Sequence, residues 1–138
     1  MNRIDTVFAA LRQRQERALI PFIVAGDPHL QATYELLCAT AESGADCIEV
    51  GVPFSDPTAD GPVLQQSAEV ALSAGTSLPA VLETIARFRA HSDVPIVLYG
   101  YYNPLFHYGG TRFAADARKA GVDGVLVVDL PPEEVGEL

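Results

Sequence analysis

The chain has 138 residues, of which 49% are hydrophobic and 20% are charged, as in a soluble globular domain with a substantial core. It carries 9 basic and 18 acidic residues, a net charge of -9. This balance argues against nucleic-acid or anionic-membrane partners, because no basic stripe could neutralise phosphates. No segment approaches the roughly 18 apolar residues of a membrane span. Residues 1–17 lack the apolar run of a signal peptide, so we expect a cytoplasmic protein.

The cysteines and histidines show no metal-binding pattern. Cys38 and Cys47 are too few and too widely spaced for a disulfide framework or a metal knuckle. Each lies in an apolar run, which predicts a buried thiol. The three histidines show no H-x-x-H or H-E-x-x-H spacing, so the sequence predicts no metal site.

The first part of the chain predicts a helix, a strand and a second helix. Apolar residues at i, i+3, i+4 and i+7 predict an amphipathic helix over residues 2–16, and the apolar run 19–25 is typical of a strand. Asp27 suits an N-cap and Pro28 suits the first helical position, so the next helix is expected over residues 30–43.

After a second strand around Glu49, apolar helices and strands continue to alternate. The expected elements are, in order, a helix over 62–74, a helix that follows a cap at Thr76 and Ser77, a strand over 96–99, an aromatic loop over 101–108, a helix from about 111 to 121, and a strand over 122–128. A short repeat supports this reading. E-S-G-A-D and K-A-G-V-D each place a capping glycine, an apolar residue and an aspartate between a helix and a strand.

Alternating strands and helices of this kind predict a parallel sheet covered by helices. Right-handed crossovers leave two main closures, an open doubly wound sheet and a (β/α)8 barrel. No G-x-G-x-x-G or Walker A motif follows a strand, which disfavours a nucleotide-binding open sheet. A complete barrel needs about 250 residues and eight strands, so four strands would supply about half of one.

Glu49 is an acid inside a strand that is otherwise apolar. Cys47, Ile48, Val50 and Val52 surround it with the residue types of a buried parallel strand. An ionised carboxylate is unfavourable there, so we expect the pKa of Glu49 to be raised and its role to be functional. The alternative is a carboxylate satisfied by backbone N–H groups or by an arginine.

Asp60 lies in the acidic, proline-rich loop that follows this strand. Asp60 and Gly61 suit a tight turn, and Pro62 suits the first turn of the following helix. A role in the turn therefore stands beside a functional role as the second carboxylate of the same region.

Four motifs occur in an order that closely resembles the α subunits of tryptophan synthase: PFIVAGDP at 21–28, IEVGVPFSDPTADGP at 48–62, YYNPLF at 101–106 and VDLPPEE at 128–134. The likeness covers almost the whole chain. It implies a (β/α)8 TIM barrel of which this chain supplies about the first four βα units. Residues 1–138 are then the N-terminal half of a single barrel domain, with the remainder absent from this sequence.

The resemblance also implies a carbon–carbon lyase of tryptophan biosynthesis that cleaves indole-3-glycerol phosphate to indole and glyceraldehyde 3-phosphate. Glu49 is expected to protonate the ring carbon that bears the side chain and then to help remove the side-chain hydroxyl proton. Asp60 is expected to stay ionised and to accept a hydrogen bond from the ring N–H. Phe22 and Tyr101 match positions that pack the indole, although each could be an ordinary core or loop aromatic.

A β subunit is the partner that the resemblance implies, in an α2β2 complex for the full-length protein. Asp56, Asn103 and Pro131 match positions at or near that contact, with simple loop structure as their alternative. Pyridoxal phosphate belongs to the β subunit, so no cofactor is expected in this chain. The phosphate site of such barrels usually follows strands 7 and 8, beyond Leu138. The isolated fragment is therefore expected to be inactive, and the other functions considered are a noncatalytic partner-binding fragment and another phosphosugar-processing barrel enzyme.

Overall fold

Four parallel strands form the sheet of this computed structural model, which describes residues 2–137. They are β1 (Phe22–Val24), β2 (Ile48–Gly51), β3 (Ile96–Gly100) and β4 (Gly124–Val127), and they neighbour one another in chain order. Each pair is parallel, so each connection returns the chain to the same end of the sheet. This topology is that of successive βα units.

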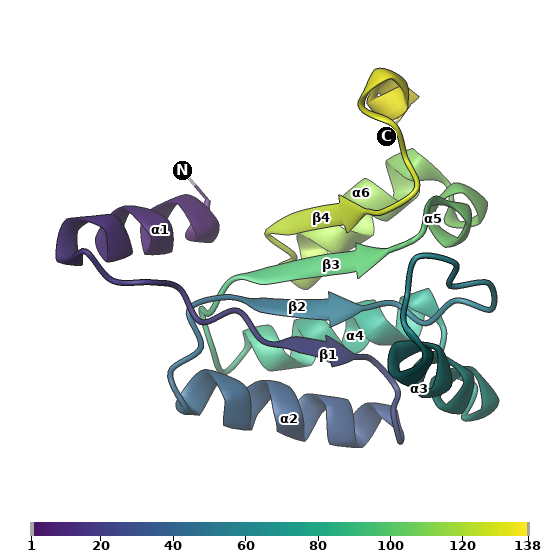
Figure 1. Ribbon diagram of the computed structural model, residues 1–138, viewed down its shortest axis with the longest axis horizontal. Helices are drawn as coiled ribbons and strands as arrows, with labels where there is room; N and C mark the ends of the chain where they lie inside the picture. Colours follow the sequence, from purple (N-terminus) through teal and green to yellow (C-terminus); the bar gives the residue numbers. More distant parts are fainter. Residues whose placement is uncertain (1, 138) are drawn as a thin grey trace.

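Helices α2, α4 and α6 form one layer against one face of the sheet, as Figure 1 shows. Helices α3 and α5 lie near the carboxyl ends of the strands, and α1 lies at the opposite end (Figure 1). The bounds of the helices are α1 (Arg3–Arg14), α2 (Leu30–Glu42), α3 (Pro62–Ser73), α4 (Leu78–Arg89), α5 (Tyr102–Tyr108), α6 (Gly110–Ala120) and the 3-10 helix η1 (Pro132–Glu137). None of the helices within residues 2–137 has the length and apolar character needed to cross a membrane.

The core lies between the sheet and this helical layer. Every second residue of a strand points toward the helices, and Ile48, Val50, Ile96 and Leu98 are at most 1% exposed there. Helix α4 packs on them because its apolar residues recur at helical spacing and are all buried: Leu78, Val81, Leu82, Ile85 and Phe88. This packing fixes which strand residues face the other side of the sheet.

The other face carries a row of four residues in register, Phe22, Glu49, Val97 and Gly124. Within residues 2–137 no second helical layer covers this face (Figure 1). Helix α1 reaches this face at the end of the sheet where the strands begin, and its Ile4 side chain lies close to Gly124. Glu49 therefore lies on the face of the sheet that is opposite to the core.

Two aspartates of the G-A-D and G-V-D repeat link the starts of neighbouring strands by the same pair of hydrogen bonds, which we call a clasp. The Asp46 carboxylate accepts a hydrogen bond from the Leu19 N–H at 2.8 Å, and the Asp46 N–H donates to the Leu19 carbonyl at 3.0 Å. Asp123 makes the same pair of bonds with Ile96, both at 2.9 Å. In each clasp the partners are 27 residues apart, so the sequence repeat corresponds to a structural repeat.

Asp123 also binds two arginines. Its side chain is 3% exposed and receives hydrogen bonds from Arg3 of α1 and Arg89 of α4, each at 3.0 Å. Burial lowers the pKa of Arg89, and the hydrogen bond to Asp123 raises the pKa of Arg3. Arg89 additionally donates to the carbonyls of Ser92, Val94 and Gly121. This cluster attaches α1 and α4 to the start of β4.

Asp123→Ala is expected to lower the free energy of unfolding by about 3 kcal/mol, because it leaves Arg89 largely buried without its carboxylate. Asp46→Ala is the matched control, since it removes the same strand clasp where no arginine of residues 2–137 makes a salt bridge. It should lose about 1 kcal/mol. Equilibrium urea unfolding measures both, and equal losses would contradict the importance of the ion pair.

Three local features differ from the sequence-based expectations. His29, not Asp27, is the N-cap of α2, and its Nδ1 accepts from the Ala32 N–H at 3.1 Å. The Gly26 N–H binds Thr33 Oγ1 in the first turn of α2, which leaves Asp27 and Pro28 in the connecting turn.

The expected aromatic loop is mostly helix α5, because a proline is tolerated in a first helical turn. Cys47 is buried, whereas Cys38 is only half-buried.

Candidate functional site

Glu49 lies in β2, half-buried, between Phe22 of β1 and Val97 of β3 in the register of the sheet. Among residues 2–137, no side chain or backbone group donates a hydrogen bond or forms a salt bridge to its carboxylate. The expected alternative, a carboxylate satisfied by an arginine or by N–H groups, therefore has no support in the described part of the chain. Burial raises the pKa of the adjacent Cys47 thiol, and the charge of Glu49 acts in the same direction. Cys47 is thus a neutral neighbour of Glu49.

Asp60 is held in the loop between β2 and α3 by backbone and side-chain contacts. Its N–H donates to the Pro57 carbonyl at 3.0 Å, and its own carbonyl accepts from Gln65 Nε2 at 2.9 Å. The Asp60 carboxylate accepts from the Tyr99 hydroxyl at 3.3 Å. The turn that the sequence predicted is present, and the carboxylate is turned toward the end of β3.

Tyr99 connects the Asp60 carboxylate with the aromatic ring of Phe22. Its ring meets the Phe22 ring edge-on, with the centroids 5.1 Å apart. Burial raises the pKa of Tyr99, and the charges of Asp60 and Glu49 raise it further. The tyrosine hydroxyl therefore stays protonated and lies within electrostatic reach of both acids. Sequence analysis missed Tyr99, because it reads as the last residue of an apolar strand.

Phe22 and Asp60 line a small cavity together with the two tyrosines at the carboxyl end of β3. Its lining includes Phe22, Gly51, Asp60, Leu64, Tyr99 and Tyr101. Gly51 is needed there, because a Cβ at this position would lie 2.7 Å from Phe22 Cζ. The lining combines aromatic surface with one carboxylate.

Tyr101 is buried and is held by contacts with the β2–α3 loop. It is 4% exposed, its hydroxyl accepts from the Ala59 N–H at 2.9 Å, and its ring packs on Phe54 with the centroids 5.2 Å apart. Burial raises its pKa. Tyr101 thus holds the backbone of the loop next to Asp60, and its expected contact with an indole ring stays a prediction.

The three residues expected near a partner each follow a different strand. Asp56 is exposed after β2, and its carboxylate accepts from Ser55 Oγ at 2.7 Å. Asn103 is exposed on α5 after β3, and Pro131 is exposed after β4. All three lie at the carboxyl end of the sheet. Nearby, Asp129 accepts a hydrogen bond from the Tyr102 N–H at the start of α5, at 2.7 Å.

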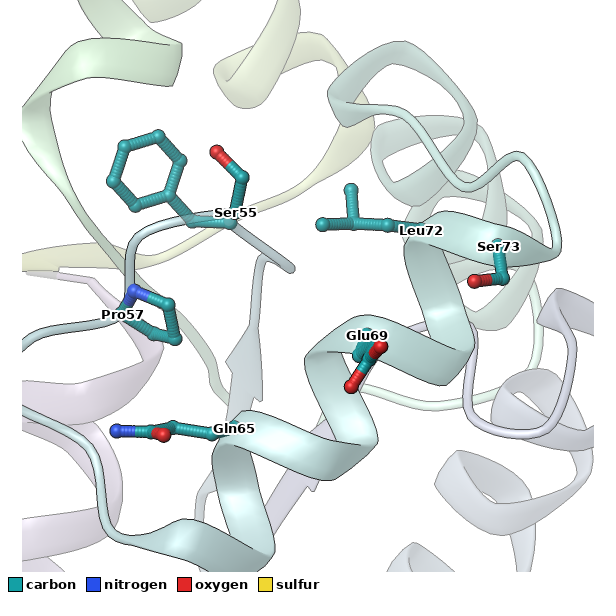
Figure 2. A pocket seen from close by; sticks show the side chains of 7 residues that line it. Ser55, Pro57, Gln65, Glu69, Leu72 and Ser73 are labelled. Atoms are coloured by element: carbon teal, nitrogen blue, oxygen red, sulfur yellow. The ribbon is translucent and has the colours of Figure 1, made fainter.

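A second hollow lies beside this site, between the β2–α3 loop and α3. Figure 2 shows Ser55 and Pro57 on the loop, with Gln65, Glu69, Leu72 and Ser73 on α3. Glu49 and Asp60 do not contribute to its lining. Within residues 2–137, no group of three or more His, Cys, Asp or Glu side chains is arranged to hold a metal ion.

Comparison with known proteins identifies relatives over almost the whole chain. The sequence model of the family described as "Tryptophan synthase alpha chain" matches residues 8–138. The tryptophan synthase alpha chain of Geobacter sulfurreducens is 59% identical over 137 residues, which are 99% of this chain and 52% of the relative. That of Citrifermentans bemidjiense is 56% identical over 138 residues, again 52% of the relative. The chain thus spans about half the length of the curated relatives it matches.

Solved structures agree with these sequence relatives. Tryptophan synthase subunit alpha from Legionella pneumophila superposes with a TM-score of 0.95 at 44% identity, covering 98% of this chain and 52% of that chain. A tryptophan synthase complex from Pyrococcus furiosus contains a chain that matches with a TM-score of 0.83 at 48% identity, covering 87% of this chain and 49% of that chain.

The predicted fold class is confirmed, because the parallel four-stranded sheet with its alternating helices corresponds to the first four βα units of the TIM barrel that these structures share. The match of the family model to residues 8–138 and the identity to its members lead to one conclusion: this chain belongs to the tryptophan synthase alpha chain family.

Proposed function

We propose that residues 1–138 form the N-terminal half of a single (β/α)8 barrel domain that cleaves indole-3-glycerol phosphate to indole and glyceraldehyde 3-phosphate. The observation that carries this proposal is the position of Tyr99, which shares the sheet face of Glu49, donates a hydrogen bond to Asp60 and packs edge-on against Phe22. Family membership favours this substrate over other phosphosugars.

Glu49 acts first as the acid. It donates its proton to the ring carbon that bears the side chain, which leaves a positive charge at the ring nitrogen. The resulting carboxylate accepts the proton of the side-chain hydroxyl while the C–C bond breaks. The electron pair of that bond neutralises the ring, and the released chain becomes an aldehyde. The lack of a hydrogen-bond partner within residues 2–137 leaves the Glu49 carboxyl available for both transfers.

Asp60 stabilises the charged intermediate. Its carboxylate accepts the hydrogen bond of the ring N–H, which strengthens as positive charge develops at the nitrogen. Phe22 and Tyr101 provide the aromatic surface on which the indole packs. The phosphate is bound by the C-terminal half of the barrel, in the loops after strands 7 and 8.

The partner of the full-length protein is a tryptophan synthase β subunit, in an α2β2 complex in the cytoplasm. Support comes from the exposure of Asp56, Asn103 and Pro131 at one end of the sheet and from the Pyrococcus furiosus relative, which is part of a tryptophan synthase complex. The β subunit carries the pyridoxal phosphate, and this chain uses no cofactor of its own.

The function can be tested in a completed barrel, in which residues 1–138 are joined to the C-terminal half of the Geobacter sulfurreducens relative. That relative is 59% identical to this chain over 137 residues, which are 52% of its length, so the two halves should meet through similar surfaces. The completed barrel is expected to release indole from indole-3-glycerol phosphate. A completed barrel that unfolds cooperatively but releases no indole would contradict the proposal.

Residues 1–138 made alone are expected to associate and to release no indole. The outer edges of β1 and β4 have no strand partner among residues 2–137, and Val125 and Leu126 are 43% and 41% exposed. Free parallel edges and apolar surface favour association. Size-exclusion chromatography with light scattering, combined with an indole assay, tests both statements.

A soluble monomer that unfolds cooperatively would contradict the expected association. Indole production by that monomer would show that the second half of the barrel is dispensable. Capture of a β subunit by residues 1–138 without lyase activity, together with an inactive completed barrel, would instead favour the noncatalytic partner-binding function.

A further inference from the structure

The site contains one contact to a catalytic carboxylate that the sequence motifs did not indicate. Tyr99 lies on the sheet face that also carries Glu49, in register with Gly51 of β2 and Leu126 of β4. Its hydroxyl reaches across to the Asp60 Oδ1 atom, 3.3 Å away. The Tyr99 hydroxyl therefore contacts the Asp60 carboxylate directly and can influence the direction of this side chain.

Two tyrosines at the carboxyl end of β3 support the loop that carries Asp60. The Tyr101 hydroxyl accepts from the Ala59 N–H and lies near Asp60, and the Tyr99 hydroxyl donates to the Asp60 carboxylate. The Tyr99 ring is in turn fixed by its edge-on contact with Phe22. The 3.3 Å distance is longer than that of a typical O–H···O bond, which indicates a weak contact that a bound ligand could tighten.

We propose that Tyr99 is a positioning residue that orients the Asp60 carboxylate toward the bound indole. By occupying Oδ1, the Tyr99 hydroxyl leaves Oδ2 for the ring N–H, and it limits the rotation of the carboxylate about its last bond. Burial and the charge of Asp60 keep the hydroxyl protonated, and therefore keep it a donor. The inference rests on the proposed lyase function, in which Asp60 accepts that N–H.

Tyr99→Phe in the completed barrel isolates the contribution of the hydroxyl, because the ring and its contact with Phe22 are retained. The kcat for indole release is expected to fall about tenfold, the lower end for loss of a hydrogen bond to a charged group. The KM is expected to change less than about twofold, because the orientation of Asp60 matters most when charge develops in the transition state.

Tyr108→Phe is the matched control. It removes another tyrosine–aspartate hydrogen bond, from Tyr108 to Asp116 at 2.7 Å, between α5 and α6 and away from the cavity that contains Asp60. Its kcat is expected to equal that of the unsubstituted completed barrel. Urea unfolding of both variants reports whether either substitution acts through stability.

A double-mutant cycle with Asp60→Asn tests whether Tyr99 acts through Asp60. On the Asp60→Asn background, Tyr99→Phe is expected to cause no further loss of kcat, because the charge that the hydroxyl orients is already absent. An equal tenfold loss on that background would overturn the inference, and so would a Tyr99→Phe variant as active as Tyr108→Phe. If the unsubstituted completed barrel releases no indole, the proposed function fails and this inference falls with it.

Discussion

Glu49→Gln in the completed barrel is expected to stop indole release while leaving substrate binding nearly intact. The amide has the shape of the carboxyl group but cannot transfer a proton to the ring carbon or accept one from the side-chain hydroxyl. General acid–base groups typically contribute 10²–10⁴-fold, and Glu49 serves in both directions, so we expect a loss of at least about 10³-fold in kcat. Continuous measurement of indole gives the rate, and equilibrium dialysis with the substrate gives the binding.

Glu83→Gln provides the control for this experiment. Glu83 is an exposed carboxylate on α4, on the opposite side of the sheet from Glu49, so its amide should leave both quantities unchanged. Turnover of Glu49→Gln at a rate near that of Glu83→Gln would refute the role of Glu49 as proton donor. Loss of binding in Glu49→Gln would point instead to a role in holding the substrate.

Asp60→Asn is expected to lower kcat by about 10²-fold, because it removes the negative charge that opposes the cation on the ring nitrogen. The effect should appear mainly in kcat, since the neutral substrate ring gains less from this charge than the transition state does. Steady-state kinetics of the completed barrel measures both constants. Asp93→Asn is a suitable control, because the Asp93 side chain is 92% exposed at the other end of the sheet.

If Asp60→Asn lowers kcat by less than about tenfold, Asp60 serves only in the turn, the role that its sequence context also allows. Comparison with Tyr99→Phe adds a second check. The larger loss must belong to the aspartate, because Tyr99 acts only by orienting it.

The alternation of strands and helices could be predicted from the sequence, because it depends on local patterns. The apolar neighbours of Glu49 and the helical spacing in α4 are visible within a few residues. The short helix α5 was expected to be a loop, since its aromatic residues show no clear stripe. Its start at Tyr102 depends partly on a hydrogen bond to Asp129, which lies 27 residues further along the chain.

The contacts of the site depend on the register of the sheet, which local patterns do not give. Tyr99 and Asp60 are 39 residues apart, and the choice of Tyr99 as a partner needs the alternation of β3 to be fixed first. Asp123 was noticed as part of a repeat, but its arginine partners are 120 and 34 residues away. In both cases the missing information was long-range pairing of polar groups, which the composition of a segment does not encode.

The paired aspartate clasps at the amino ends of the strands have a consequence for how this sheet tolerates change. A shift of one residue in strand pairing would turn every side chain of that strand to the opposite face, so Glu49 would enter the core. Asp46 and Asp123 prevent such slippage by locking two neighbouring pairs at the rim farthest from the acids. Alignment is thereby anchored at one rim, and the loops of the other rim are free to vary in length and sequence without misaligning the strands. Stability and chemistry are thus assigned to opposite ends of the same sheet.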